Sequence, residues 1–212
     1  MVITNRLGIT DSPTLAREEE RISKKAATTL FEKNLLNDMP SGTWTTLQKI
    51  HTILFQDIYD FAGALRSVNI AKGNFRFVPV MYLAEAVRTI EDMPQSTFDE
   101  IVEKYVEMNV AHPFREGNGR TQRVFWSLCA MEAGYDLDWT SVSSRDMDSA
   151  SKIARPNDDL TALKAIFKEI AIPFNKNSSL PIDAVYKRLL RVRNHLSMQA
   201  DRTYDLTEKY IR

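Results

Sequence analysis

The chain has 212 residues with 28 basic and 28 acidic side chains, so its formal net charge is zero. A chain without excess positive charge lacks the electrostatic footprint of a nonspecific nucleic-acid binder, and we expect no nucleic-acid partner. Its hydrophobic content of 43% is sufficient for the core of one compact domain. No apolar run approaches the roughly 18 residues of a membrane span, so we expect no membrane partner either.

The predicted elements are mostly helices, because apolar residues recur at helical spacing along most of the chain. Helices are predicted, in chain order, at residues 13–36, 47–58, 81–93, 98–108, 120–133, 145–154 and 158–171. Ser12 and Pro13 suit the N-cap and first position of the first helix, while Pro94 and Gly134 end the third and the fifth. The sequence therefore predicts a mainly α fold, a compact helical bundle.

One stretch, residues 66–80, breaks the helical pattern. Ser67–Ile70 and Phe75–Val80 are rich in β-prone residues, and Lys72–Asn74 between them is typical of a turn. We expect a short β-hairpin here.

The pattern changes again after residue 172. Residues 173–180 have the composition of a linker, and an apolar stripe with basic residues on either side follows it. The stripe consists of Val185, Leu189, Val192 and Leu196. We expect a domain at residues 1–172 and, at 173–212, a linker with an amphipathic C-terminal helix.

The most informative segment is residues 112–123, which read HPFREGNGRTQR. Two glycines around Asn118 can take backbone conformations closed to other residues, so Gly117, Asn118 and Gly119 can direct successive N–H groups at an anion. A helix begins just after them, and its N-terminus also favours negative charge. Arg120 and Arg123, three residues apart on one helix face, add forked donors suited to a di- or triphosphate.

Two further side chains of this segment suggest chemistry. Glu116, an acid among phosphate-binding groups, is suited to hold the magnesium ion that accompanies a nucleotide. His112 can take a proton from an attacking hydroxyl, because imidazole titrates close to neutral pH. Taken singly, the histidine could be a cap and Glu116 with Arg120 a surface ion pair, but their joint spacing favours a site. His51 and His195 are expected to be structural.

The segment resembles the signature of the Fic family, H-x-F-x-[D/E]-G-N-G-R-x-x-R, at every fixed position. The resemblance implies a Fic-type helical bundle that transfers AMP from ATP to a Ser, Thr or Tyr hydroxyl of a target protein, releasing pyrophosphate. It makes His112 the general base, Phe114 a core anchor of the loop and Glu116 the ligand of Mg2+. It also implies that Gly117, Asn118 and Gly119 bind the α and β phosphates, and that Arg120 and Arg123 contact the β and γ phosphates.

The hairpin also matches the family pattern, as the flap that lies over the active site and aligns the target segment by strand pairing. Its tip and second strand contribute Lys72, Gly73, Asn74 and Phe75. An exposed strand edge is a template for an extended peptide, so a target protein is expected along the flap. A small structural hairpin is the alternative, and Lys72 could equally be a solvated turn residue.

Many Fic proteins resemble one another in having an inhibitory helix with the pattern [S/T]-x-x-x-E-[G/N]. The glutamate of that helix pairs with the second arginine of the signature, which here is Arg123. The nearest match is residues 14–19, which lack the final Gly or Asn. We therefore expect a small antitoxin to supply that glutamate. Cys129 is the single cysteine, so no internal disulfide can form, and the N-terminus has no signal pattern. A cytoplasmic location is expected, in a bacterium or, for a secreted effector, in its host.

Alternative functions remain at this point. A Fic-fold relative could use another nucleotide donor or remove AMP, and the chain could be a non-catalytic interaction module. The intact Gly-Asn-Gly turn argues against a kinase relative, and the intact signature argues against the non-catalytic reading.

Overall fold

A computed structural model describes residues 2–157, 159–173 and 204–205. The fold is mainly helical, as the sequence predicts. The helices are α1 (Ser12–Glu32), α2 (Trp44–Phe55), α3 (Val80–Glu91), α4 (Phe98–Ala111), α5 (Asn118–Glu132), the 3-10 turn η1 (Trp139–Ser141), α6 (Ser144–Asn157) and α7 (Thr161–Ile170). The strands are β1 (Ile70–Lys72), β2 (Phe75–Arg76), β3 (Tyr135–Leu137), β4 (Ala171–Pro173) and β5 (Tyr204–Asp205).

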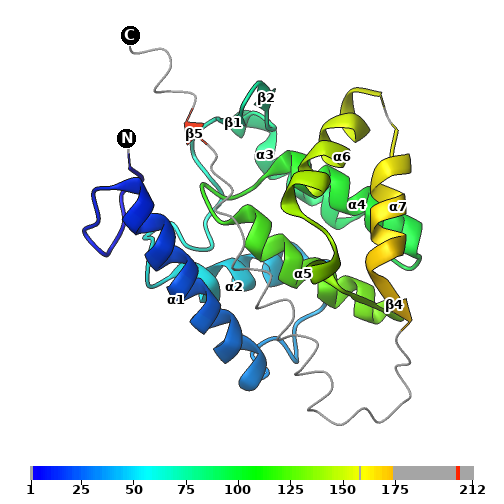
Figure 1. Cartoon of the computed structure of the whole chain (residues 1–212), viewed down its shortest axis with the longest axis horizontal. Helices are drawn as coiled ribbons and strands as arrows, with labels where there is room; N and C mark the ends of the chain where they lie inside the picture. The colour runs from blue at the N-terminus through cyan, green and yellow to red at the C-terminus, as the bar shows by residue number, and fades with distance from the viewer. Residues whose placement is uncertain (1, 158, 174–203, 206–212) are drawn as a thin grey trace.

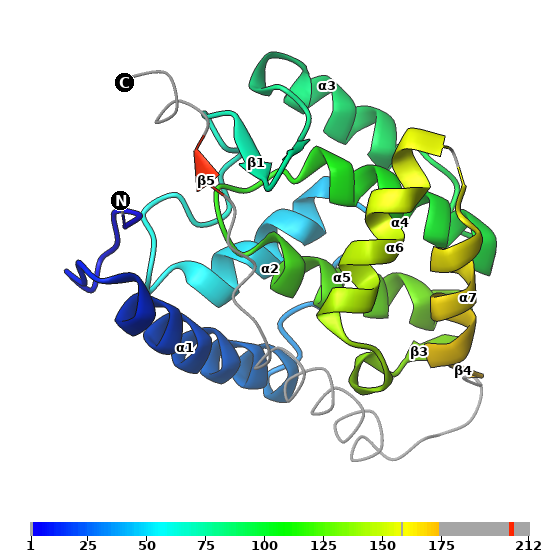
Figure 2. The ribbon, with the colours of Figure 1, turned by 45° about the horizontal axis from the view of Figure 1, so that its top comes forward.

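Helix α5 is at the centre of the bundle, with α1 on one side and α6 and α7 on the other (Figures 1 and 2). It packs against α2 and α4, while α1 covers α2. Its buried positions include Phe125 and Trp126, both with no exposed surface. Because α5 is surrounded, its N-terminus is fixed by several elements at once, and the signature residues precede and begin this helix.

The helix starts follow from local capping. The Asp11 carboxylate accepts the Thr14 N–H at 2.8 Å, so α1 is capped one residue before the Ser12 that the sequence suggests. Thr97 and Glu100 form a reciprocal capping box at the start of α4. Helix α2 ends earlier than predicted, at Phe55, because the chain turns there while Ile58 stays buried.

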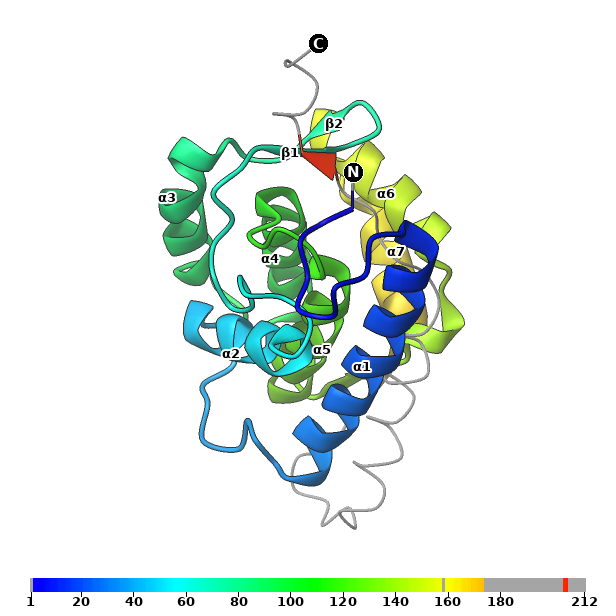
Figure 3. The ribbon, with the colours of Figure 1, turned by 90° about the vertical axis from the view of Figure 1, so that its left-hand side faces the viewer.

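The predicted hairpin is present but short. Strands β1 and β2 pair antiparallel, with Lys72 opposite Phe75, so Lys72 lies in a strand and Gly73 and Asn74 form the turn. The hairpin is at one end of the molecule, beside α4 (Figure 3). On its other side β1 pairs with β5, which places Tyr204 opposite Ala71. This strand is not predicted from the sequence.

A second unpredicted ladder, between β3 and β4, joins the end of α5 to the end of α7. Each strand has three residues, too few for a periodicity to be detected. The linker and tail helix expected beyond residue 173 lie outside the described residues. Within the described part of the chain, no helix has both the length and the apolar character needed to cross a membrane.

Candidate active site

The signature residues form the connection between α4 and α5. His112 is the C-cap of α4 and has a left-handed backbone, with φ 47° and ψ 63°. Gly117 is the N-cap of α5 and is also left-handed, with φ 79°. A left-handed backbone is uncommon for a residue with a side chain, so the surrounding contacts must hold His112 in it.

The His112 ring has a defined tautomer. Its Nδ1 lies 3.0 Å from the carbonyl oxygen of Asn109, and a carbonyl can only accept, so Nδ1 carries the hydrogen. The nitrogen that can take a further proton is therefore Nε2. The ring is buried, and it stacks on Phe77 of the hairpin with ring centroids 3.9 Å apart. This geometry fits the predicted general base.

Arg66 holds the His112 backbone in place, a role that the sequence did not reveal. Its guanidinium donates to the carbonyls of His112 (2.9 Å) and Ala111 (3.1 Å), at the C-terminal end of α4. It also donates to Val68 (2.8 Å) and Val78 (2.5 Å), at the base of the hairpin. Burial, and then the charge of Arg115, lowers the pKa of Arg66 to about 10, so it stays cationic at neutral pH. One buried cation thus joins the hairpin to the catalytic loop.

Asn118 clamps the loop from within. Its side chain accepts the Phe114 N–H at 2.9 Å and donates to the Phe114 carbonyl at 2.8 Å. The first intrahelical bond shown at this end runs from Thr121 N–H to Gly117 O, so the N–H groups of Asn118 and Gly119 are at the open end of α5. The arrangement fits the predicted phosphate nest, with the Asn118 side chain shaping it.

His51 and Phe114 anchor the loop in the core. The Phe114 ring stacks between His51 (3.8 Å) and Trp44 (5.4 Å), which fits its expected role as an anchor. His51 Nδ1 accepts the Gly63 N–H at 2.8 Å, so Nε2 carries the hydrogen and donates to the Glu116 carbonyl at 2.9 Å. Burial lowers the pKa of His51 to about 4. The histidine expected to be structural therefore supports the signature directly.

Glu116 is buried beside the nest. Its Oε1 accepts the Gly117 N–H at 3.0 Å. No cluster of three or more His, Cys, Asp or Glu side chains suited to a metal occurs among the described residues. A single carboxylate next to a phosphate site fits magnesium, which usually takes one or two carboxylates together with nucleotide phosphates.

The two arginines have different surroundings. Arg120 is buried and forms an ion pair with Glu19 of α1. Arg123, one turn later, is partly exposed. The structure thus brings both arginines to the first turns of α5, but it directs Arg120 toward α1.

The flap residues lie where a target could reach them. Gly73 and Asn74 are exposed, and Lys72 and Phe75 are partly exposed. The Phe75 ring meets Phe77 edge-on at 5.2 Å, so an aromatic path connects the hairpin surface to His112. Phe77 is a further site residue that the sequence alone did not single out.

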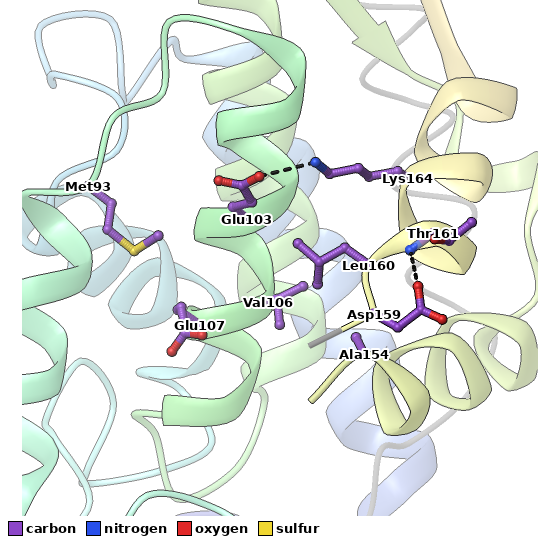
Figure 4. Close-up of a pocket in the computed structure, with 9 residues that line it drawn as sticks. All are labelled: Met93, Glu103, Val106, Glu107, Ala154, Asp159, Leu160, Thr161 and Lys164. Atoms are coloured by element: carbon purple, nitrogen blue, oxygen red, sulfur yellow. Dashed lines mark hydrogen bonds and ion pairs between the residues drawn. The ribbon is translucent and has the colours of Figure 1, made fainter. Parts of the chain in front are cut away.

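A cleft of about 730 Å³ lies elsewhere, between α4, α6 and α7 (Figure 4). Its lining residues are Met93, Glu103, Val106, Glu107, Ala154, Asp159, Leu160, Thr161 and Lys164. Its three carboxylates oppose one lysine, and that lysine already pairs with Glu103 at 3.1 Å. An acidic lining disfavours binding of a nucleoside triphosphate, and no signature residue lines this cleft.

Comparison with known proteins supports the signature. A sequence model of the Fic/DOC family matches residues 43–130. The probable protein adenylyltransferase Fic of Salmonella typhimurium is 34% identical over 179 residues, 79% of this chain and 86% of that protein. The chain belongs to the Fic/DOC family. The protein adenylyltransferase VbhT of Bartonella schoenbuchensis is 36% identical over 71% of this chain, which is 33% of its own length.

Solved structures share the fold. The BepC protein of Bartonella tribocorum, solved with bound AMPPNP, has a TM-score of 0.69 at 19% identity and covers 82% of this chain and 94% of its own. A Fic domain of a Bartonella quintana effector, solved with bound ADP, has a TM-score of 0.67 at 21% identity, covering 81% of this chain and 91% of its own. The Bartonella quintana structure is named as a Fic domain, and the Fic fold expected from the signature is confirmed.

We predict that Gly117→Ala is more destabilising than Gly73→Ala. Both glycines have a positive φ, so each alanine carries backbone strain of about 1 kcal/mol. A Cβ on Gly117 would also lie 2.4 Å from Cζ of Phe55, whereas a Cβ on Gly73 meets nothing within 4 Å. In denaturant unfolding, the free energy of unfolding should fall by about 3 kcal/mol in Gly117→Ala and by about 1 kcal/mol in Gly73→Ala. Equal losses would show that the Phe55 contact relaxes freely.

The chain should lose stability as the pH falls through the range set by His51. The folded pKa of His51, about 4, lies below the ordinary value of 6.5, so the unfolded chain binds more protons between these values. The contribution of neutral His51 to the free energy of unfolding is complete above pH 6.5 and is lost progressively as the pH falls to 4. Melting temperatures at pH 7 and pH 4.5 should differ less in His51→Gln than in the unaltered chain. An equal difference in both proteins would mean that His51 is not the titrating group.

Proposed function

We propose that the chain is a protein adenylyltransferase that transfers AMP from ATP to a hydroxyl of a target protein. The observation that carries this function is His112, a buried histidine whose Nδ1 is directed at the Asn109 carbonyl, placed a few residues before the N-terminus of α5. Three relatives that are 31% to 36% identical to the chain, two named probable protein adenylyltransferase and one named protein adenylyltransferase, support the same reaction.

The reaction assigns one task to each part of the signature. The target oxygen forms a bond to the α phosphorus of ATP while the bond from that phosphorus to pyrophosphate breaks, and His112 Nε2 takes the hydroxyl proton. The N–H groups of Asn118 and Gly119 bind the α and β phosphates at the helix end. Arg123 contacts the terminal phosphates: it follows one turn later on α5 and is partly exposed, and a guanidinium has forked donors for phosphate oxygens.

Mg2+ fits beside Glu116, where it would neutralise phosphate charge and orient the pyrophosphate leaving group. The support is the chemistry of the site, one buried carboxylate next to donors that suit phosphate. Glu116 keeps its own place through the bond from the Gly117 N–H and through the His51 bond to its carbonyl.

The target hydroxyl comes from an extended segment that adds to the hairpin. Strand β2 is at the edge of the three-stranded sheet, while β1 is covered by β2 on one side and β5 on the other. We place the target backbone along β2, where Phe75 and Phe77 lead from the hairpin to His112. Backbone pairing aligns a Ser, Thr or Tyr without reading much of the sequence around it.

A separate small protein controls the enzyme by supplying a glutamate to Arg123. The internal segment that most resembles an inhibitory helix supports this assignment, because its glutamate, Glu18, pairs with Arg21 of the same helix at 2.8 Å. A carboxylate from a partner can then decide whether Arg123 receives the γ phosphate. The reaction takes place in a cytoplasm, that of the bacterium or of a host.

Replacing His112 with alanine removes the base but not the phosphate site. We expect AMP transfer to fall by about 10² to 10⁴, while ATP binding changes little. Transfer can be followed with ATP labelled at the α phosphate and a cell extract as the source of targets. Near-native labelling by His112→Ala would contradict the mechanism.

Replacing Glu116 with alanine should raise the magnesium concentration needed for the half-maximal rate. The matched control is Glu107→Ala, which removes an exposed carboxylate of α4 and should leave the magnesium titration unchanged. If Glu116→Ala and the unaltered chain titrate alike, the metal is held by other groups.

A further inference from the structure

Helix α1 carries a buried carboxylate that the fold uses for a definite purpose. Three consecutive glutamates, Glu18, Glu19 and Glu20, follow one another in α1. Glu18 and Glu20 are partly exposed and form ion pairs with basic residues of the same helix. Glu19 is only 4% exposed and lies on the face that packs on the core. An ionisable residue is seldom buried without a charged partner.

That partner is Arg120, the first arginine of the signature. The Arg120 guanidinium pairs through Nη2 with Oε1 of Glu19, and Nη1 donates to the Ser23 hydroxyl at 3.2 Å. The other carboxylate oxygen of Glu19 accepts the Tyr59 hydroxyl. Burial, and then the charge of Glu116, raises the pKa of Tyr59, so this hydroxyl stays protonated and can donate. Both oxygens of Glu19 therefore have a donor.

The guanidinium of Arg120 also lies 4.9 Å from the centre of the Phe55 ring, the ring against which Gly117 packs. Arg120 is 6% exposed. Its Nη1 and Nη2 are both directed at α1, so a phosphate that took these two groups would separate Arg120 from Glu19 and leave that carboxylate buried without its counter-charge, which is strongly unfavourable. Nucleotide binding by Arg120 therefore competes with an interaction that the buried structure requires.

We propose that Glu19 is a positioning residue of the active site: it holds Arg120, and through Arg120 the first turn of α5, whose N–H groups form the phosphate site. Arg123 is then the arginine that contacts phosphate, and Arg120 supports the site from behind. This differs from the expectation that both arginines contact phosphate, and it rests on the proposed function. It also makes α1, which lies outside the family match at residues 43–130, part of the nucleotide-binding unit.

The test is a double-mutant cycle read out as binding of a nonhydrolysable ATP analogue. Glu19→Gln keeps the size of the side chain and an acceptor for Tyr59 but leaves Arg120 without its counter-charge. Arg120→Gln leaves Glu19 buried and unpaired. Each single change should weaken nucleotide binding at least about tenfold, and the double change, which removes both charges, should return the affinity to within about threefold of the unaltered chain.

Controls separate this role from a general loss of stability. Glu20→Gln removes a partly exposed carboxylate of the same helix and should bind nucleotide normally. Arg123→Gln should weaken binding whether or not Glu19 and Arg120 are changed. If a single variant of the pair fails to fold, the double variant with matched charges still decides the question, because its affinity alone discriminates between support and phosphate contact.

Three outcomes would overturn the proposal. Tighter nucleotide binding or faster AMP transfer by Glu19→Gln would make Glu19 an inhibitory competitor for Arg120. Normal nucleotide binding by Glu19→Gln would show that Glu19 does not position the site. Equal weakness of Arg120→Gln and the double variant would make Arg120 a phosphate ligand. An unaltered chain that binds nucleotide but transfers no AMP would refute the proposed function alone, since the binding cycle does not depend on transfer.

Discussion

The active site depends on the interaction that holds His112 in a left-handed backbone at the end of α4. Arg66 supplies it, because one buried guanidinium satisfies carbonyl groups at the C-terminus of α4 and at the base of the hairpin. The helix end favours a cation, and the forked shape of the arginine lets it bind several carbonyls at once. One side chain therefore joins His112, the hairpin and the end of α4.

The other half of the site is fixed in the same way, by buried polar side chains bonded to backbone groups. His51 donates to the Glu116 carbonyl, Asn118 clasps Phe114, and the Glu19–Arg120 pair ties the first turn of α5 to α1. In the proposed reaction, phosphate groups would meet N–H donors that are already oriented, so little reorganisation would accompany binding. Most of the signature residues are buried, and a polar group buried in this way is costly unless it is paired.

The helices and the signature could be predicted from the sequence because both are local: helical periodicity and a fixed spacing of residue types appear within short windows. The buried residues that hold the signature in place could not be predicted in this way. Arg120 and Ser23 are 97 residues apart, and a lone buried glutamate looks like its solvated neighbours unless its place in the apolar stripe of α1 is noticed. The β3–β4 and β1–β5 pairings join distant segments of two or three residues, so no local sequence pattern predicts them. The residues next to Arg66 in the sequence do not indicate that its side chain binds backbone carbonyls.

The most direct test of this account is a crystal structure of the chain with magnesium and a nonhydrolysable ATP analogue. We predict phosphates at the N-terminus of α5, within hydrogen-bond distance of the Asn118 and Gly119 N–H groups, with the α phosphorus facing His112 Nε2. Nucleotide bound in the cleft between α4, α6 and α7, or phosphates placed away from the α5 N-terminus, would contradict it.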